Sequence, residues 1–245
     1  MKKNPLLLAA LTLALSLFTT SALAQGGPGG PGMDGAIAKL FGDNKAFTTT
    51  VEFHTTLPSG AEMTMPGKMA FLDGKTRFEM DMADMKGGGL PPGAVAQMKQ
   101  MGMDRMATLG LPDKKQAYII YPNLKAYVPA PAGAGAITSA ADYKSEATKL
   151  GAETVDGHDC VKNKVVVTGP DGVPHESTVW NAKDLNQFPV KIQMAPAQGM
   201  NAVMLFKDVK LSKPDAAQFD LPAGYTKYDD MTGLMMSRMK AAPPQ

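Results

Sequence analysis

The chain contains little cysteine and histidine, and this scarcity excludes several kinds of site. Cys160 is the only cysteine among 245 residues, so no disulfide can form within the chain. His54, His158 and His175 stand far apart, and no H-x-x-x-H, H-E-x-x-H or C-x-x-C spacing supports a zinc site. Free cysteines are among the most buried residues in proteins, so we expect Cys160 to pack in the core.

The motifs of common enzyme classes are also missing. The sequence has no G-x-S-x-G turn, no P-loop and no G-x-G-x-x-G after a predicted strand. Gly87-Gly88-Gly89 has the composition of a linker and not of a phosphate-binding loop. His158 and Cys160 would share one face of a strand, but a packed cysteine beside a turn histidine accounts for the pair. We therefore expect a non-enzymatic protein with no catalytic residues and no cofactor.

No apolar run is long enough to span a bilayer comfortably, since spanning takes about 20 residues. The longest run, Leu6–Phe18, follows two lysines and precedes Ala22-Leu23-Ala24. This is the pattern of a signal peptide over residues 1–24, cleaved near Ala24-Gln25. We expect an exported, periplasmic protein that does not span the membrane after cleavage.

The chain has no excess of charge of one sign. Loss of Lys2 and Lys3 with the signal peptide takes the basic residues from 25 to 23, which equals the 23 acidic residues. A balanced chain with interspersed signs lacks the electrostatic footprint of a nucleic-acid-binding protein. We therefore expect no nucleic-acid partner.

A long series of strand patterns follows a Gly/Pro-rich linker at 25–33. Alternation of apolar and polar side chains with a period of two predicts strands, and turn residues such as Asp73-Gly74 separate them. One apolar and one polar face on consecutive strands is typical of an antiparallel meander. About ten strands are expected, the clearest at 47–54, 61–71, 76–82, 106–111, 115–121, 125–128, 161–168, 174–180, 190–194 and 203–211.

Four short helical patterns are available to cover the apolar face, which such a sheet must bury. Apolar spacing and capping residues predict helices at 34–43, 93–105, 139–150 and 230–240. We expect a single β domain over 34–229 and an amphipathic helix with a tail over 230–245.

Several short motifs occur in an order that resembles a known group of exported proteins. Residues 104–128 contain P-D-K-K-Q-A-Y-I-I-Y-P and K-A-Y, and residues 151–226 contain E-T-V-D-G-H-D-C, T-V-W, F-P-V-K and F-D-L-P-A-G-Y. The order resembles an uncharacterised exported bacterial family that is similar to the superfamily of the periplasmic outer-membrane lipoprotein carrier and receptor. The resemblance implies a mainly β, strongly curved antiparallel half-barrel. Short helices would cover its concave apolar face, where such carriers hold acyl chains.

One departure limits what the resemblance implies. In the carrier, an arginine on the strand before an aromatic run holds the lid helices in place. The alignment puts Gly74 at that position, and not Arg77. The resemblance therefore supports the fold, but not the transport of lipoproteins as such.

Methionine is the residue that the chain has in excess. Ten of its 19 methionines lie between Met63 and Met106. Three interpretations stay open: core packing, the deformable wall of a lipid cavity, and a soft-metal site, since thioethers favour Cu(I). Alternation puts the strand methionines on the face opposite His54, so a copper site would fall in the helical region. Its ligands would be Met98, Met101, Met103 and Met106.

The function we expect is reversible binding of a lipid or other amphiphile in an apolar groove on the concave side of the sheet. The groove residues would be Phe47, Val51, Phe53, Met63, Met65, Met69, Phe71, Phe78, Met80, Met82 and Trp180. Helices 93–105 and 230–240 would form a lid, and an envelope protein partner would favour the open state during transfer. The alternatives are a methionine-rich copper-binding or envelope-stress protein, and an interaction domain whose groove is filled by its own helices.

Overall fold

The computed structural model describes residues 35–88, 93–131, 139–196 and 200–241, so the predicted signal peptide and linker lie outside the described residues. The long strands are β1 (Ala46–Thr56), β2 (Glu62–Leu72), β3 (Lys75–Asp81), β5 (Arg105–Leu111), β6 (Gln116–Tyr121), β7 (Ala126–Pro129), β8 (Lys144–Val155), β9 (His158–Thr168), β10 (Pro174–Ala182), β11 (Phe188–Met194) and β12 (Asn201–Lys210). Two short strands, β4 (Lys86–Gly87) and β13 (Thr226–Lys227), complete the set within the described ranges.

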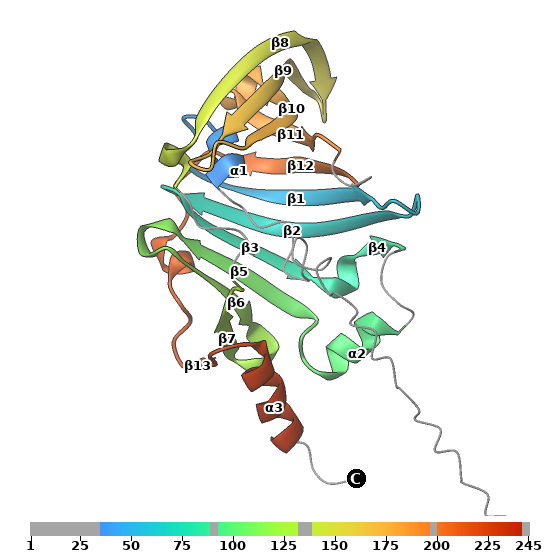
Figure 1. Cartoon of the computed structure of the whole chain (residues 1–245), viewed down its shortest axis with the longest axis vertical. Helices are drawn as coiled ribbons and strands as arrows, with labels where there is room; N and C mark the ends of the chain where they lie inside the picture. The colour runs from blue at the N-terminus through green and yellow to red at the C-terminus, as the bar shows by residue number, and fades with distance from the viewer. Residues whose placement is uncertain (1–34, 89–92, 132–138, 197–199, 242–245) are drawn as a thin grey trace, which may run out of the picture.

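All of these strands belong to one open sheet of thirteen strands (Figure 1). Its order is β13-β7-β6-β5-β3-β2-β1-β12-β11-β10-β9-β8, with β4 added to β2. Neighbouring strands pair antiparallel, except that β13 runs parallel to β7. The sheet curls over at its β8–β11 end. The predicted mainly β, open antiparallel half-barrel is therefore confirmed.

The hairpin between β2 and β3 shows how the sequence sets the register. Leu72 pairs with Lys75, so Asp73 and Gly74 form a two-residue turn. Their φ values are 49° and 89°, and positive φ at both positions is typical of the hairpin turn that matches strand twist. This register keeps Met69 opposite Phe78, on the apolar face.

The helices are short and lie at separate places along the sheet. They are α1 (Gly35–Leu40), α2 (Ala94–Gln100) and α3 (Met231–Ala241). α1 contacts β9 and α3 contacts β7, whereas α2 lies near the start of β5 (Figure 1). The helix predicted over 93–105 is shorter than expected, because Gly102 takes a φ of 71° and β5 begins at Arg105.

The predicted helix at 139–150 is wrong. Ser139 does cap a helical turn, accepting a hydrogen bond from the Ala141 N–H at 3.2 Å, but the turn ends at Asp142. From Lys144 the chain forms β8, an edge strand paired only with β9. Its side chains are almost all exposed, so β8 has no apolar face, and its Ala, Lys, Glu and Leu residues resemble those of a helix. The count of about ten strands is low partly for this reason.

Apolar side chains are buried on both faces of the sheet. The larger cluster lies on the concave face, where β1, β2, β3, β11 and β12 contribute alternate residues. A smaller cluster on the other face is formed by Leu109, Leu111, Tyr118 and Ile120 and is covered by the C-terminal segment through Phe219. Arg77 also binds this segment, since its Nη1 donates to the Gln218 carbonyl at 3.2 Å. It therefore does not hold a lid helix.

Candidate ligand-binding site

The concave face is divided into an aromatic part and a methionine-rich part. In the aromatic part, Phe41 follows α1 and is only 1% exposed. Its ring centroid lies 4.8 Å from Phe47, 5.5 Å from Phe71 and 5.6 Å from both Phe188 and Phe206. The protein's own phenylalanine therefore fills this part of the predicted groove.

Four predicted groove residues lie in or beside the aromatic part. Phe47 and Val51 are 0% exposed, and Met69 and Phe71 are also buried. Phe188 and Phe206 complete the aromatic part but were missed in the sequence, because single phenylalanines on distant strands give no signal of convergence. Phe206 is the cross-strand partner of Val51, a pairing that only the sheet order reveals.

Methionines dominate the other part of the concave face, which we call the methionine end. Met65, Met80, Met82 and Met106 are all buried there, together with Phe53 and Phe78. The rings of Phe53 and Phe78 meet edge to face at 5.2 Å. A Cβ on Gly67 would lie 2.3 Å from the Phe78 ring, so glycine at this position lets that ring lie against β2.

A pocket of about 310 Å³ opens at the methionine end. Met63 and Met85 line it together with Val95 of α2, and Gly87, Gly88, Gly93 and Ala96 complete the lining with Lys86. Met85 and Val95 also pack against the buried cluster. This volume is near the lower limit of ordinary small-molecule sites. Of the predicted groove residues, only Met63 lines this pocket.

The residues from 93 to 104, which we call the α2 segment, cover part of the methionine end. Val95, Met98 and Met103 of this segment are partly buried and pack against the concave cluster. The Met103 N–H donates to the Met98 carbonyl at 2.8 Å, which folds the segment back after α2. The predicted lid helix at this position therefore does contact the apolar face.

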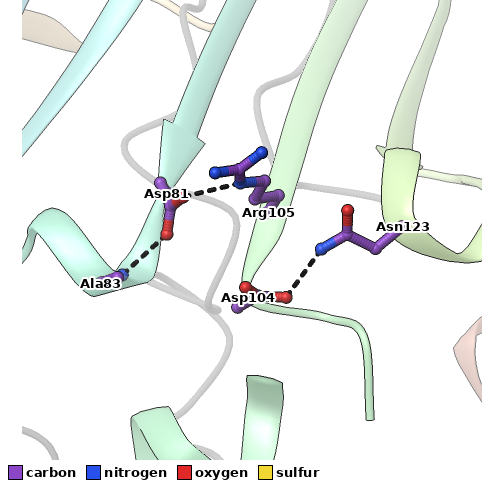
Figure 2. Close-up of polar contacts among 5 residues, drawn as sticks. All are labelled: Asp81, Ala83, Asp104, Arg105 and Asn123. Atoms are coloured by element: carbon purple, nitrogen blue, oxygen red, sulfur yellow. Dashed lines mark hydrogen bonds and ion pairs between the residues drawn. The ribbon is translucent and has the colours of Figure 1, made fainter. Parts of the chain in front are cut away.

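Polar contacts fix the points where the chain leaves and rejoins the sheet (Figure 2). Asp81 accepts from Arg105 Nε at 2.7 Å and from the Ala83 N–H at 2.9 Å. Asp104 is 7% exposed and accepts from Asn123 Nδ2 at 2.9 Å, while its carbonyl accepts from the Met82 N–H at 2.8 Å. The hydrogen bonds to Ala83 and Arg105 lower the pKa of the Asp81 carboxyl. Both ends of residues 82–104 are thus anchored.

The four methionines proposed for copper do not share one environment. Met106 is a buried strand residue of β5, whereas Met98, Met101 and Met103 are partly buried in the α2 segment. No group of three or more His, Cys, Asp or Glu side chains within the described ranges is placed to hold a metal. Copper binding by the thioethers remains a prediction.

Trp180 is buried, and its polar and aromatic contacts are made by the protein itself. Its Nε1 donates to Glu153 Oε2 at 2.9 Å. The Nζ atoms of Lys162 and Lys191 lie 4.9 and 4.3 Å from its ring centroid. Bonding to Trp180 and Lys162 lowers the pKa of Glu153. Trp180, on β10, therefore connects β10 to β8 across the intervening β9.

The His158 imidazole and the Cys160 thiol have different partners, and the Cys160 Sγ donates to the His158 backbone carbonyl at 3.4 Å. His158 Nδ1 lies 2.7 Å from Asp184 Oδ2, which lowers the pKa of Asp184. Cys160 is 1% exposed, as predicted, and burial raises the pKa of its thiol. His54 Nδ1 lies 3.1 Å from Thr64 Oγ1, away from the methionines.

In the described part of the chain, no helix has the length and apolar character needed to cross a membrane. The chain matches no family model and no curated protein.

Similar solved structures include a LolA superfamily protein from Nitrosomonas europaea, at 14% identity and a TM-score of 0.41, covering 76% of this chain and 97% of that chain. A second is a chain of the Pseudomonas aeruginosa MucA/MucB complex, at 16% identity and a TM-score of 0.39, covering 76% of this chain and 60% of that chain. A third is the Mycobacterium tuberculosis lipoprotein LppX, at 9% identity and a TM-score of 0.37, covering 71% and 91%. The likeness between this chain and these three structures concerns the fold alone.

Proposed function

We propose that this protein is exported to the periplasm and reversibly binds the acyl chain of an anionic amphiphile at the methionine end. The pocket lined by Met63, Met85 and Val95 supports this most directly, because Met85 and Val95 also pack against the buried cluster. Lys86 also lines the pocket and is exposed. Its ammonium group suits an anionic head group at the entrance.

Methionine suits a wall that accepts chains of different shape, because its side chain is unbranched and its thioether is polarizable. Each buried methylene contributes about 0.8 kcal/mol, so about six methylenes would contribute about 5 kcal/mol. A longer chain would need the α2 segment to move and expose Met65, Met80 and Met82. The groove residues of the aromatic part, Phe47, Val51, Met69 and Phe71, would be reached only if Phe41 also moved.

The pocket can be tested by filling it. Val95→Phe places an aromatic ring in the lining, whereas Val173→Phe makes the same change at a residue that is 49% exposed and does not line the pocket. Titration with a fluorescent fatty acid should show at least about tenfold weaker binding for Val95→Phe, a loss of about 1.4 kcal/mol. Equal affinity in the two variants would contradict the proposed site.

The head-group contact has its own test. Lys86→Gln should weaken the binding of a fatty acid more than the binding of the matching fatty alcohol, because only the acid carries a charge. Equal loss for both ligands would argue against an ionic contact. Native mass spectrometry of the protein purified from bacterial periplasm should detect a co-purified lipid if the ligand is abundant there.

A second candidate function is an interaction domain whose groove is self-filled. The position of Phe41 among Phe47, Phe71, Phe188 and Phe206 favours it, since that part of the concave face is already packed. Under this hypothesis the wild-type protein would bind no fatty acid, and Val95→Phe would change nothing.

A further inference from the structure

We propose that the methionine end is an oxidation-sensitive latch, in which two-electron oxidants convert methionine thioethers to sulfoxides and release the α2 segment. The inference extends the proposed function, because release would open the pocket. Release can nevertheless be measured without any ligand, so the two proposals can fail separately.

The argument begins with which side chains form the contact. On the α2 segment, Met98 and Met103 pack against the concave cluster, and both are partly buried. Met85 packs against the same cluster, and Met63 and Met85 are partly buried and line the pocket together with Val95 of the α2 segment. Partly buried thioethers therefore lie both on the α2 segment and in the lining of the pocket beside it, where solvent can reach them.

Deeper residues make the contact sensitive to any polarity introduced there. Met65, Met80, Met82 and Met106 are between 4% and 6% exposed and form the apolar surface beneath the partly buried methionines. The S=O group of a sulfoxide at Met98 or Met103 would need a hydrogen-bond donor, and this apolar surface offers none. The oxidised side chain can find a donor only by rotating toward water, and this rotation moves the α2 segment off the sheet.

An electrophilic oxidant of the hypochlorous acid class supplies the oxygen atom and accepts the two electrons. The thioether sulfur donates an electron pair to the oxidant oxygen, an S–O bond forms, the O–Cl bond breaks, and chloride and a proton leave. The sulfur is oxidised by two electrons and the chlorine is reduced by two. Methionine sulfoxide reductases reverse the change.

The anchored ends confine the response. The Asp81–Arg105 ion pair and the Asp104–Asn123 hydrogen bond hold the chain where it enters and leaves the sheet, and they contain no sulfur (Figure 2). Oxidation should therefore release residues 93–104 while the strands remain paired.

The test combines peptide mass spectrometry with hydrogen–deuterium exchange on the full chain, before and after limited hypochlorous acid treatment. Sulfoxide should form at Met63, Met85, Met98 and Met103, and exchange in 93–104 should rise about tenfold, the factor that 1.4 kcal/mol gives. Reduction by a pair of sulfoxide reductases should restore slow exchange.

Leucine variants separate the latch from general oxidative damage. Leucine is similar in volume to methionine and is tolerated in cores, but it is not oxidised to a sulfoxide. The variant with leucine at all four positions should show no oxidant response, whereas Met236→Leu, at a residue on α3 that is 59% exposed, should respond like wild type. If the fourfold variant fails to fold, Met98→Leu/Met103→Leu should at least halve the oxidant-induced rise in hydrogen–deuterium exchange of residues 93–104.

Two results would overturn the proposal. One is oxidation confined to exposed residues such as Met236. The other is sulfoxide formation at Met98 and Met103 with unchanged exchange in 93–104. Neither result depends on whether the protein binds a fatty acid.

Discussion

Asp81 and Arg105 are direct cross-strand partners on β3 and β5, and Arg105 Nε donates a hydrogen bond to Asp81 Oδ2 at 2.7 Å. Between them in sequence lie the short strand β4, which pairs with β2, and the α2 segment. The pair therefore closes the base of the excursion that carries the α2 segment (Figure 2).

Loss of the Asp81 carboxylate should loosen this excursion. Asp81→Ala removes both the ion pair and the cap on the Ala83 N–H, and loss of such a cap costs about 1 kcal/mol. Hydrogen–deuterium exchange should become faster in 82–88 and 93–104, and urea denaturation should show the stability change. Arg105→Gln removes only the ion pair, so it should have a smaller effect. Equal exchange in Asp81→Ala and wild type would rule out this anchoring role.

The same contacts predict a direction for the pH dependence. Because the pKa of Asp81 is lowered in the folded protein, its stabilising effect is present above the unfolded value of 3.8 and is lost as the pH falls through the folded pKa. Exchange in 82–88 should therefore stay slow at pH 5 and rise only below about pH 3.8. A rise already complete at pH 5 would contradict the shift.

Phe41 should be among the most important residues for stability. Phe41→Ala removes the ring that contacts Phe47, Phe71, Phe188 and Phe206, and buried Phe→Ala changes cost about 3–5 kcal/mol. Urea denaturation monitored by circular dichroism measures the loss. Leu211→Ala, at a residue that is 40% exposed, should cost less than about 1 kcal/mol. Similar losses in the two variants would show that Phe41 is not central to the core.

Trp180 provides a spectroscopic test of the β8 edge, since it is the only tryptophan. Glu153→Ala removes the acceptor of the indole N–H, so Trp180 emission should shift, whereas Glu146→Ala on the same strand should leave it unchanged. Because bonding lowers the pKa of Glu153 from 4.5, wild-type emission should stay constant until the pH falls below that value. A transition centred above it would be inconsistent with the Glu153 contacts.

Tyr121 should limit stability at high pH. Burial raises its pKa to about 12 from 10.0, so the unfolded state ionises first. The stability is intact below pH 10 and is lost as the pH rises toward 12, by about 3 kcal/mol. Urea midpoints measured between pH 9 and 11.5 should fall less steeply for Tyr121→Phe than for the control Tyr225→Phe. Identical slopes would contradict the assignment.

The sequence predicted the strands whose two faces differ. In β1–β3, apolar residues alternate with polar ones, and the observed register keeps Phe53 opposite Met65 and Met69 opposite Phe78. A single-residue slip would expose all of them. The period-two placement of the strand methionines was predictable for the same reason, whereas the burial of Cys160 was predicted from the general tendency of free cysteines to be buried.

The helical prediction for 139–150 failed because alternation of apolar and polar residues gives no information about an exposed segment. Glu146, Lys149 and Leu150 are exposed at the edge of the sheet. No side chain there has to be buried, so the sequence need not alternate between apolar and polar residues. Pairing with β9 makes this segment a strand. The pairing consists of backbone hydrogen bonds, and the pattern of side chains does not predict those.

By itself, the sequence determined the mainly β class, the apolar face and its methionine-rich region, because alternation and composition are local properties. Only the tertiary structure decided that Phe41 fills the aromatic part of that face while Met63, Met85 and Val95 leave a pocket at the other end. The physical reason is that filling depends on which distant segments converge in space, and convergence follows from the sheet order and curvature of the whole chain.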